Sequence, residues 1–267
     1  MNLLEYKLGR GVSAFSTRRS SFAETLGRDE LCNAGEQGAY SSFNITHYCG
    51  DDSRHVASCR KALCGHLGID DDHLILPRQT HTDNVFVLER KYFETFPEMR
   101  WRLLEEQDAV VTREKGVCIG VSTADCVPVL MYDAEAEVIA AVHAGWRGMV
   151  RRISQKALAA MVKLGADPQR VKVVVGPSIG PESFEVGEDV VDAFLDEGFH
   201  PCILSRQWAK PHIDLWCACS MQLEESGVLL RNMQFAGVDT FARPDEFFSA
   251  RRLGINSGRI FTGIMMK

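Results

Sequence analysis

Residues 121–149 read VSTADCVPVLMYDAEAEVIAAVHAGWRGM. Two apolar runs, Val127–Tyr132 and Val138–Val142, are separated there by a short polar segment. This pattern predicts two strands joined by a tight connection, which brings the residue before the first strand close to the residue after the second. Cys126 and His143 occupy those positions. We therefore expect these two side chains to meet at one end of the strand pair.

A third candidate ligand, His81, lies in the polar segment Gln79-Thr80-His81, between two strand-like runs. Zinc binds thiolate and imidazole, and catalytic zinc sites use three protein ligands and leave a position open for water or substrate. His81, Cys126 and His143 are therefore a candidate zinc site. None of these three residues belongs to a compact zinc-binding pattern such as C-x₂-C or H-E-x-x-H. The residues alone therefore allow an alternative, in which the three side chains have separate structural roles.

Two charged residues flank these ligands. Asp125 precedes Cys126, where it can orient a metal ligand or carry a proton. Arg147 lies in His143-Ala144-Gly145-Trp146-Arg147-Gly148, where the glycines allow close approach and the guanidinium suits an anion. A plain turn from strand to helix is the alternative interpretation of that segment.

Other candidates are less specific. Arg18 follows the strand-like run Val12–Ser16 and either binds an anion or belongs to a solvated arginine pair, and the same choice holds for Arg251-Arg252. Cys217 and Cys219 have C-x-C spacing on a predicted helix, point to different faces and are interpreted as packing thiols. The histidines outside the candidate zinc site are interpreted as surface or capping residues: His47, His55, His66, His73, His200 and His212.

The remaining pattern mixes strands with helices without strict alternation. It predicts one α/β domain over residues 1–267, with mixed β-sheets and helices outside. The segments expected to be helical share 3.6-residue apolar spacing or capping signals and are 51–67, 148–164, 187–195, 212–226 and a short piece near 23–26 within a long loop. The segments expected to be strands, besides those above, are 75–81, 84–88, 108–112, 116–122, 171–175 and 235–238.

Composition restricts the function classes. The net charge of −6 argues against nucleic acid as the main partner, because phosphate binding needs a basic surface. No signal peptide and no apolar run of membrane-spanning length is visible, which predicts a cytoplasmic protein without a membrane partner. Nine scattered cysteines are then expected to be reduced thiols.

Several blocks occur in an order that resembles the YfiH family, also called the laccase-domain or polyphenol oxidase family. They cover nearly the whole chain, and the T-A-D-C-x-P and H-A-G-W-R-G blocks are the most specific. The blocks are Phe15-Ser16-Thr17-Arg18, Asn44, Gln79-Thr80-His81, 108–112, 123–130, 143–148, 176–180, Phe247-Phe248-Ser249 and Arg251-Arg252.

The resemblance implies an α-β-β-α sandwich with zinc held by His81, Cys126 and His143. It implies purine nucleoside phosphorylase activity on adenosine, inosine and methylthioadenosine, together with adenosine deaminase activity. Copper-dependent phenol oxidation and the editing of peptidoglycan precursors are further activities assigned to this family. For phosphorolysis, the residues expected to bind substrate or phosphate are Arg18, Asn44, Gln79 and Arg147, and those expected to act in catalysis are Asp125, Cys126 and Arg147.

The chain departs from the family pattern at three places. Thr82 replaces the glycine that usually follows the histidine, and Ser20-Ser21 replaces a glycine pair after Arg18-Arg19. A cysteine often seen near the C-terminal arginines is replaced around Asp239-Thr240. Because these changes touch the expected pocket rim, substrate preference is the property they are expected to affect.

Three functions are compatible with these residues. A zinc-activated water can attack the purine carbon that bears the amino group, and arginines can hold phosphate beside the ribose. A multicopper oxidase needs several histidine-rich clusters, whereas the chain has eight histidines and no H-x-H pair, so copper in the zinc site is the simpler source of any phenol oxidation. The same zinc-activated water can also attack an amide of a cell-wall precursor.

Overall fold

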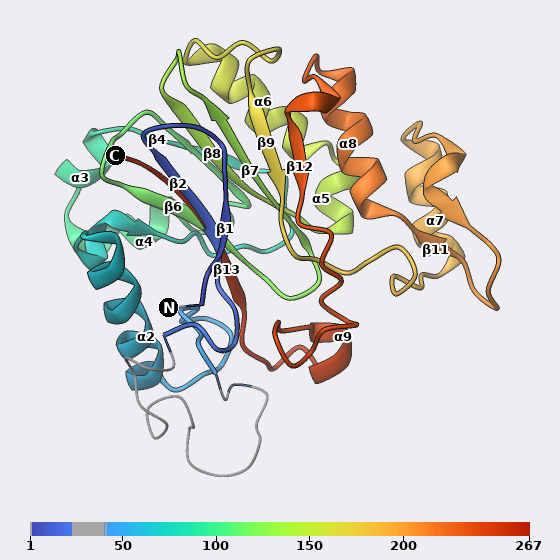
Figure 1. Cartoon of the computed structure of the whole chain (residues 1–267), viewed down its shortest axis with the longest axis horizontal. Coiled ribbons are helices and arrows are strands. Elements are labelled where there is room, and N and C mark those ends of the chain that lie inside the picture. The colour runs from blue at the N-terminus through green and yellow to red at the C-terminus, as the bar shows by residue number, and fades with distance from the viewer. Residues whose placement is uncertain (1, 23–39, 41) are drawn as a thin grey trace.

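The computed structural model describes residues 2–22, 40 and 42–267. The described strands form two large sheets and one small sheet (Figure 1). The five-stranded sheet contains, in spatial order, β1 (Leu4–Tyr6), β2 (Val12–Ser16), β13 (Ile260–Met266), β6 (Cys118–Thr123) and β3 (Leu74–Ile75). The six-stranded sheet contains β12 (Met233–Phe235), β9 (Lys172–Val175), β7 (Val127–Asp133), β8 (Val138–Ala144), β5 (Ala109–Thr112) and β4 (Val85–Leu88). The small sheet pairs β10 (Leu204–Ser205) with β11 (His212–Ile213).

The helices lie mostly between these strands in the chain. The α-helices are α2 (Ser53–Leu67), α3 (Lys91–Glu94), α4 (Pro97–Leu103), α5 (Trp146–Val150), α6 (Ile153–Lys163), α7 (Glu188–Asp196), α8 (Leu215–Glu225) and α9 (Ala250–Leu253). The 3₁₀ helices are η1 (Asp71–His73), η2 (Pro201–Ile203) and η3 (Leu230–Asn232). None of the helices described is both long and apolar enough to cross a membrane.

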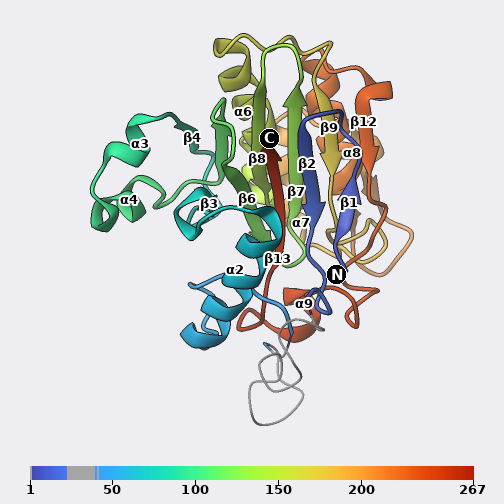
Figure 2. The same ribbon diagram turned by 60° about the vertical axis from the view of Figure 1, so that its left-hand side comes forward.

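The two large sheets lie face to face between helical layers. Along β7, Val129 and Met131 point into a core shared with α6 and α8, whereas Leu130 and Tyr132 point into a second core between the sheets. This alternation follows from the two-residue period of a strand that is buried on both faces. On the other side of the sandwich, Phe261 of β13 packs in a third core with side chains of α2. Figures 1 and 2 show α2 on one side and α6 and α8 on the other, which confirms the predicted mixed α-β-β-α sandwich.

The strand pair predicted from residues 121–149 is confirmed. β7 and β8 are antiparallel, and the register places Pro128 opposite His143 and Val127 opposite Ala144. The residue just before β7 therefore lies beside the end of β8. The predicted strand at Val12–Ser16 and the helix ending before Gly68 are confirmed as well, and Asp52 caps that helix by accepting from the backbone N–H groups of residues 54 and 55.

Two predicted helices are corrected by the structure. The expected single helix over 148–164 is two helices, because Arg152 between them adopts a left-handed conformation with φ of 66°. The Arg152 guanidinium donates to the Glu225 carboxylate at 2.8 Å and to the Glu197 carbonyl at 2.7 Å. These contacts with distant residues fix a backbone conformation that local helix propensity does not predict.

The expected helix over 212–226 begins later than predicted. His212 and Ile213 form β11, and α8 starts at Leu215 after the Asp214 side chain accepts from the Cys217 N–H. The predicted strand at 235–238 is also shifted, since β12 ends at Phe235. The short helix expected near residues 23–26 lies outside the described residues.

Candidate metal centre

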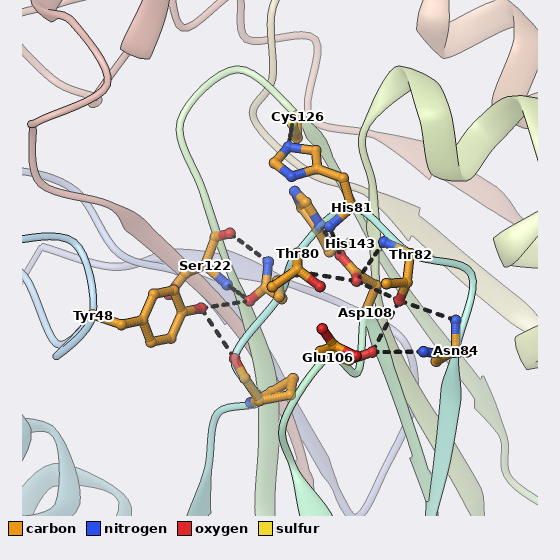
Figure 3. Close-up of polar contacts among 12 residues, drawn as sticks. Tyr48, Thr80, His81, Thr82, Asn84, Glu106, Asp108, Ser122, Cys126 and His143 are labelled. Atoms are coloured by element: carbon orange, nitrogen blue, oxygen red, sulfur yellow. Dashed lines mark hydrogen bonds and ion pairs between the residues drawn. The ribbon is translucent and has the colours of Figure 1, made fainter.

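The structure brings His81, Cys126 and His143 together at one end of the β7–β8 pair. Their ligand atoms all lie within 4.8 Å of one another, and the Cys126 Sγ is 3.7 Å from the His81 Nε2. His143 comes from the end of β8 and Cys126 from the turn before β7, whereas His81 comes from a turn after β3, with φ of 63°. Figure 3 shows the three side chains converging.

A buried carboxylate, Asp108, holds two of these ligands in place. Its side chain accepts from the backbone N–H groups of Thr80, His81 and Thr82 at 2.8–3.2 Å, and from the Thr82 hydroxyl at 2.7 Å. It also bonds the Nδ1 atom of His143 at 2.6 Å. One fully buried carboxylate therefore fixes both the turn that carries His81 and the ring orientation of His143 (Figure 3).

These residues fit a metal ion that prefers nitrogen and sulfur ligands. Because Asp108 takes the Nδ1 atom of His143, the Nε2 atom is the nitrogen left for a metal, which is the usual carboxylate–histidine–metal arrangement. His143 is buried, Cys126 is half-buried and His81 is exposed, so the cluster has one open side. Two imidazoles and one thiolate with one open side are the donor set of a catalytic zinc site.

The charges of the ligands favour metal binding. Burial opposes ionisation of the Cys126 thiol, but the neighbouring His143 and His81 outweigh it and lower the pKa of that thiol to about 6. Burial also opposes protonation of His143, yet the Cys126 thiolate and Asp108 raise the pKa of its imidazole to about 9. The metal-free pair is thus a thiolate beside an imidazolium, and a bound metal ion would take the place of the imidazolium proton.

Gly145 is required for this packing. A Cβ atom at that position would lie 2.8 Å from the His81 Cδ2 and 3.1 Å from the Cys126 Sγ, both closer than ordinary contact. We expect Gly145→Ala to displace both ligands and to weaken zinc binding about 10- to 100-fold. Competition with a fluorescent zinc chelator measures this change. Gly65→Ala in α2, where no atom lies within 4 Å of the added Cβ and the backbone is helical, is the comparison variant, and equal zinc affinity in the two variants would contradict the packing requirement.

The cluster forms part of the wall of a cavity of about 640 Å³. This volume is in the range of small-molecule sites. Apolar side chains of Ile179 and Phe184 and the two cations Arg251 and Arg259 also line it. Arg251 lies over the Phe184 ring at 5.5 Å and donates to the Glu185 carbonyl. The Arg259 guanidinium donates to the backbone carbonyls of Ile255, Ser257 and Gly258. Among the described residues, no carboxylate forms an ion pair with either guanidinium, so both charges remain available to an anion.

The two arginines expected to bind phosphate lie elsewhere. Arg18 forms an ion pair with Glu246 and stacks on Phe247, and it does not line the cavity. Arg147 is exposed, with its guanidinium 4.3 Å from the centre of the Trp146 ring, and it does not line the cavity either. The guanidinium groups that line the cavity are therefore those of Arg251 and Arg259.

Gln79 and Asn44 hold other parts of the wall. The Gln79 amide donates to the Ser122 carbonyl at 2.7 Å and accepts from the Ser122 N–H at 2.8 Å, which joins the turn before His81 to β6. The Asn44 oxygen accepts from the Arg259 N–H at 3.2 Å, and the Asn44 amide donates to Asp51 at 2.7 Å. Gln79 lines the cavity, whereas the fully buried Asn44 does not line it but contacts two residues that do, Cys49 and Arg259.

Asp125 lines the cavity but is tied to the C-terminal segment. Its carboxylate accepts from the Thr240 hydroxyl and from the Arg251 N–H, each at 2.7 Å. Its backbone has φ of 88°, which turns the chain sharply before Cys126. Asp125 therefore positions α9, and with it Arg251, beside the metal cluster.

The sequence did not reveal the roles of Asp108 and Arg259 at this site, nor that His55 is buried. Asp108 directly precedes the apolar strand β5. An acidic residue next to a buried strand was the sequence feature that could have identified it. His55 is buried, contrary to its interpretation as a surface or capping residue, with Nδ1 2.9 Å from Asp51 and Nε2 3.5 Å from the Cys59 thiol. No sequence signal marked Arg259, which lies in a loop after α9.

Comparisons with known proteins show which family and which fold this chain resembles. Residues 32–267 match the family model described as multi-copper polyphenol oxidoreductase laccase. A purine nucleoside phosphorylase of Bacteroides thetaiotaomicron is 43% identical over 86% of this chain and 87% of its own length. Adenosine deaminase RL5, from an unknown prokaryotic organism, is 41% identical over 96% of this chain and 95% of its own. The crystal structure of Bacillus licheniformis hypothetical protein YfiH superposes with a TM-score of 0.86 at 22% identity, over 99% of this chain and 96% of that one.

Proposed function

This chain belongs to the laccase-like family of multi-copper polyphenol oxidoreductases, and from that premise we propose that it is a zinc-dependent purine nucleoside phosphorylase that also deaminates adenosine. The observation that carries the proposal is the His81–Cys126–His143 cluster in the wall of a cavity that also presents the guanidinium groups of Arg251 and Arg259. The names of two relatives that are more than 40% identical supply the substrate class.

The zinc ion would be held by the Cys126 thiolate, by His81 and by the Nε2 atom of His143. When bound, zinc lowers the pKa of a water molecule to about 7 and supplies a nucleophile for deamination. Asp125 is the acid among the described residues that line the cavity, and we assign it the proton transfer to the departing amine. The buried wall of Ile179 and Phe184 excludes water and suits the apolar faces of a purine.

Phosphorolysis needs a phosphate ion beside the anomeric carbon of the ribose. We assign its binding to Arg251 and Arg259, because a planar guanidinium matches phosphate oxygens with two parallel hydrogen bonds. The Arg251 backbone is fixed by Asp125 and the Arg259 backbone by Asn44. The four residues therefore form one unit in which Asp125 and Asn44 hold the two cations in position.

We expect Arg251→Ala to raise the KM for phosphate about tenfold or more, while kcat for adenosine deamination stays within about twofold, because deamination uses water rather than phosphate. Steady-state assays that vary phosphate at saturating inosine, alongside a phosphate-free deaminase assay, measure both quantities. The matched control is Arg252→Ala, since the adjacent Arg252 donates to the Phe241 carbonyl and does not line the cavity. An equal loss of both activities in Arg251→Ala would contradict the assignment.

The proposed function is tested with zinc-reconstituted protein and a panel of adenosine, inosine and methylthioadenosine, with and without phosphate. We expect free base and ribose-1-phosphate (5-methylthioribose-1-phosphate from methylthioadenosine) only with phosphate, and inosine from adenosine without it. Metal analysis of protein produced without added copper checks the choice of zinc. Protein that holds one zinc ion per chain and forms none of these products would refute the proposal.

Oxidation of phenols is the competing activity suggested by the family description. Four-electron reduction of oxygen requires several copper ions held by separate ligand clusters. In the described part of the chain, the one group of three or more His, Cys, Asp or Glu side chains suited to a metal is His81, Cys126 and His143. This single donor set suits zinc hydrolytic chemistry better than multi-electron transfer.

A further inference from the structure

A second cluster of soft ligands lies outside the cavity lining, where η2 meets α8. The Cys202 Sγ is 3.9 Å from the Met221 Sδ, and the Cys202 thiol interacts electrostatically with the Cys217 thiol. Cys217 and Met221 are four residues apart on α8 and so lie on the same face of that helix. The earlier interpretation of Cys217 and Cys219 as packing thiols holds for the fully buried Cys219, whereas Cys217 is half-buried in this sulfur cluster.

The local fold holds the three sulfur atoms in place. The β10–β11 pair lies between η2 and α8 in the chain, with Leu204 opposite Ile213, and it returns the chain so that Cys202 faces the first turns of the helix. The Asp214 N–H donates to the Ile203 carbonyl at 2.8 Å, and the Asp214 side chain accepts from the Cys217 N–H at 2.9 Å. Ile203 and Ile213 are almost fully buried in the core shared with α8. The segment that carries Cys202 is therefore anchored to the helix that carries its two partners (Figure 1, α8 and β11 on the right).

We propose that Cys202, Cys217 and Met221 form a second metal site, which binds one soft monovalent ion, Cu(I), through three sulfur atoms. Thiolate and thioether ligands select Cu(I), whereas zinc sites use cysteine, histidine and carboxylates and lack the methionine thioether. Three sulfur atoms in a plane around one ion, at a metal–sulfur distance of about 2.3 Å, lie about 4 Å apart, close to the Cys202–Met221 separation.

Cys202 is exposed and Cys217 and Met221 are half-buried, so an ion can enter from solvent. Binding transfers no electrons: the two thiols release protons to solvent and the copper stays Cu(I). Because the three residues do not line the cavity, this site and the His81–Cys126–His143 centre can be separated by mutation.

The test uses the full chain carrying Cys126→Ser, which removes the thiolate of the first centre, kept reduced and free of oxygen. Titration with Cu(I) against the chromophoric chelator bicinchoninate is expected to show one ion retained per chain. Adding Cys202→Ser should weaken its binding about 100-fold and adding Met221→Leu about tenfold, with Met99→Leu as the methionine control. Circular dichroism checks that each variant is folded.

X-ray absorption of the Cys126→Ser protein loaded with one Cu(I) identifies the ligands directly. Three sulfur neighbours and no nitrogen support the site. Nitrogen ligands, or Cu(I) affinity unchanged by both Cys202→Ser and Met221→Leu, would overturn it. Neither readout depends on nucleoside chemistry, so the experiment tests the Cu(I) site independently of the proposed enzymatic function.

Discussion

Cys126→Ala is expected to reduce bound zinc from about one ion per chain to less than about 0.1 and to lower phosphorolysis and deamination at least about 1000-fold, which corresponds to a loss of about 4 kcal/mol of transition-state stabilisation. Cys126 is the sole thiolate of the centre, and its negative charge compensates both the metal ion and the buried imidazole of His143. Without it, the centre keeps only the imidazoles of His81 and His143 as ligands. Such a pair binds zinc weakly at neutral pH.

Zinc content by mass spectrometry and activity on adenosine and inosine are measured on the same preparations. His66→Asn, a substitution at an exposed histidine outside the cavity, is the control and should retain both zinc and activity. A Cys126→Ala protein that keeps more than about a tenth of its activity with no bound metal would show that the centre is not needed for the reaction.

Asp108→Ala is expected to lower the free energy of unfolding of the metal-free protein by about 3–5 kcal/mol, because it removes one partner of a buried ion pair and leaves buried N–H groups without an acceptor. The N–H groups of Thr80, His81 and Thr82 all depend on this carboxylate. Zinc affinity should fall a further 10- to 100-fold, since the turn of His81 and the ring of His143 lose their common anchor.

Urea unfolding in the presence of a chelator measures the first effect, and zinc competition the second. Thr82→Val removes the hydroxyl that donates to the same carboxylate and accepts from the Asn84 N–H, but it keeps the carboxylate and its bonds to the backbone N–H groups, so it should cost only about 1–2 kcal/mol. Asp108→Asn retains one oxygen acceptor but loses the negative charge, so it should weaken zinc binding more than it weakens folding. A loss of stability in Asp108→Ala no greater than in Thr82→Val would show that the turn does not depend on the carboxylate.

The sequence predicted best where a local pattern and the tertiary structure agree. The β7–β8 pair follows from two continuous apolar runs and a short polar connection, and its register brings Cys126 beside His143. The break between α5 and α6 was not predictable, because Arg152 is held in its left-handed conformation by Glu225 and Glu197, which are distant in sequence. Local propensity contains no information about such contacts.

The site shows the same contrast between local patterns and distant contacts. Local motifs identified His81 and His143 as candidate ligands, but no local pattern shows that Asp108 accepts hydrogen bonds from both of their segments. Arg18 and Arg147 were expected to bind phosphate from their place beside strands and glycines. The structure pairs Arg18 with Glu246, and it places Arg259, from a loop without a motif, in the cavity wall.

The position of β13 has a consequence for biosynthesis. This strand pairs with β2 on one side, where Thr262 lies opposite Ser16, and with β6 on the other, where Thr262 lies opposite Val121. The middle of the five-stranded sheet is therefore translated after both of its neighbours. While residues 260–266 remain inside the ribosome, β2 and β6 expose unsatisfied backbone edges and apolar faces, which invite aggregation. The nascent chain is thus expected to need chaperone protection until translation has passed this strand, and the cavity wall at Arg259 to form only after that.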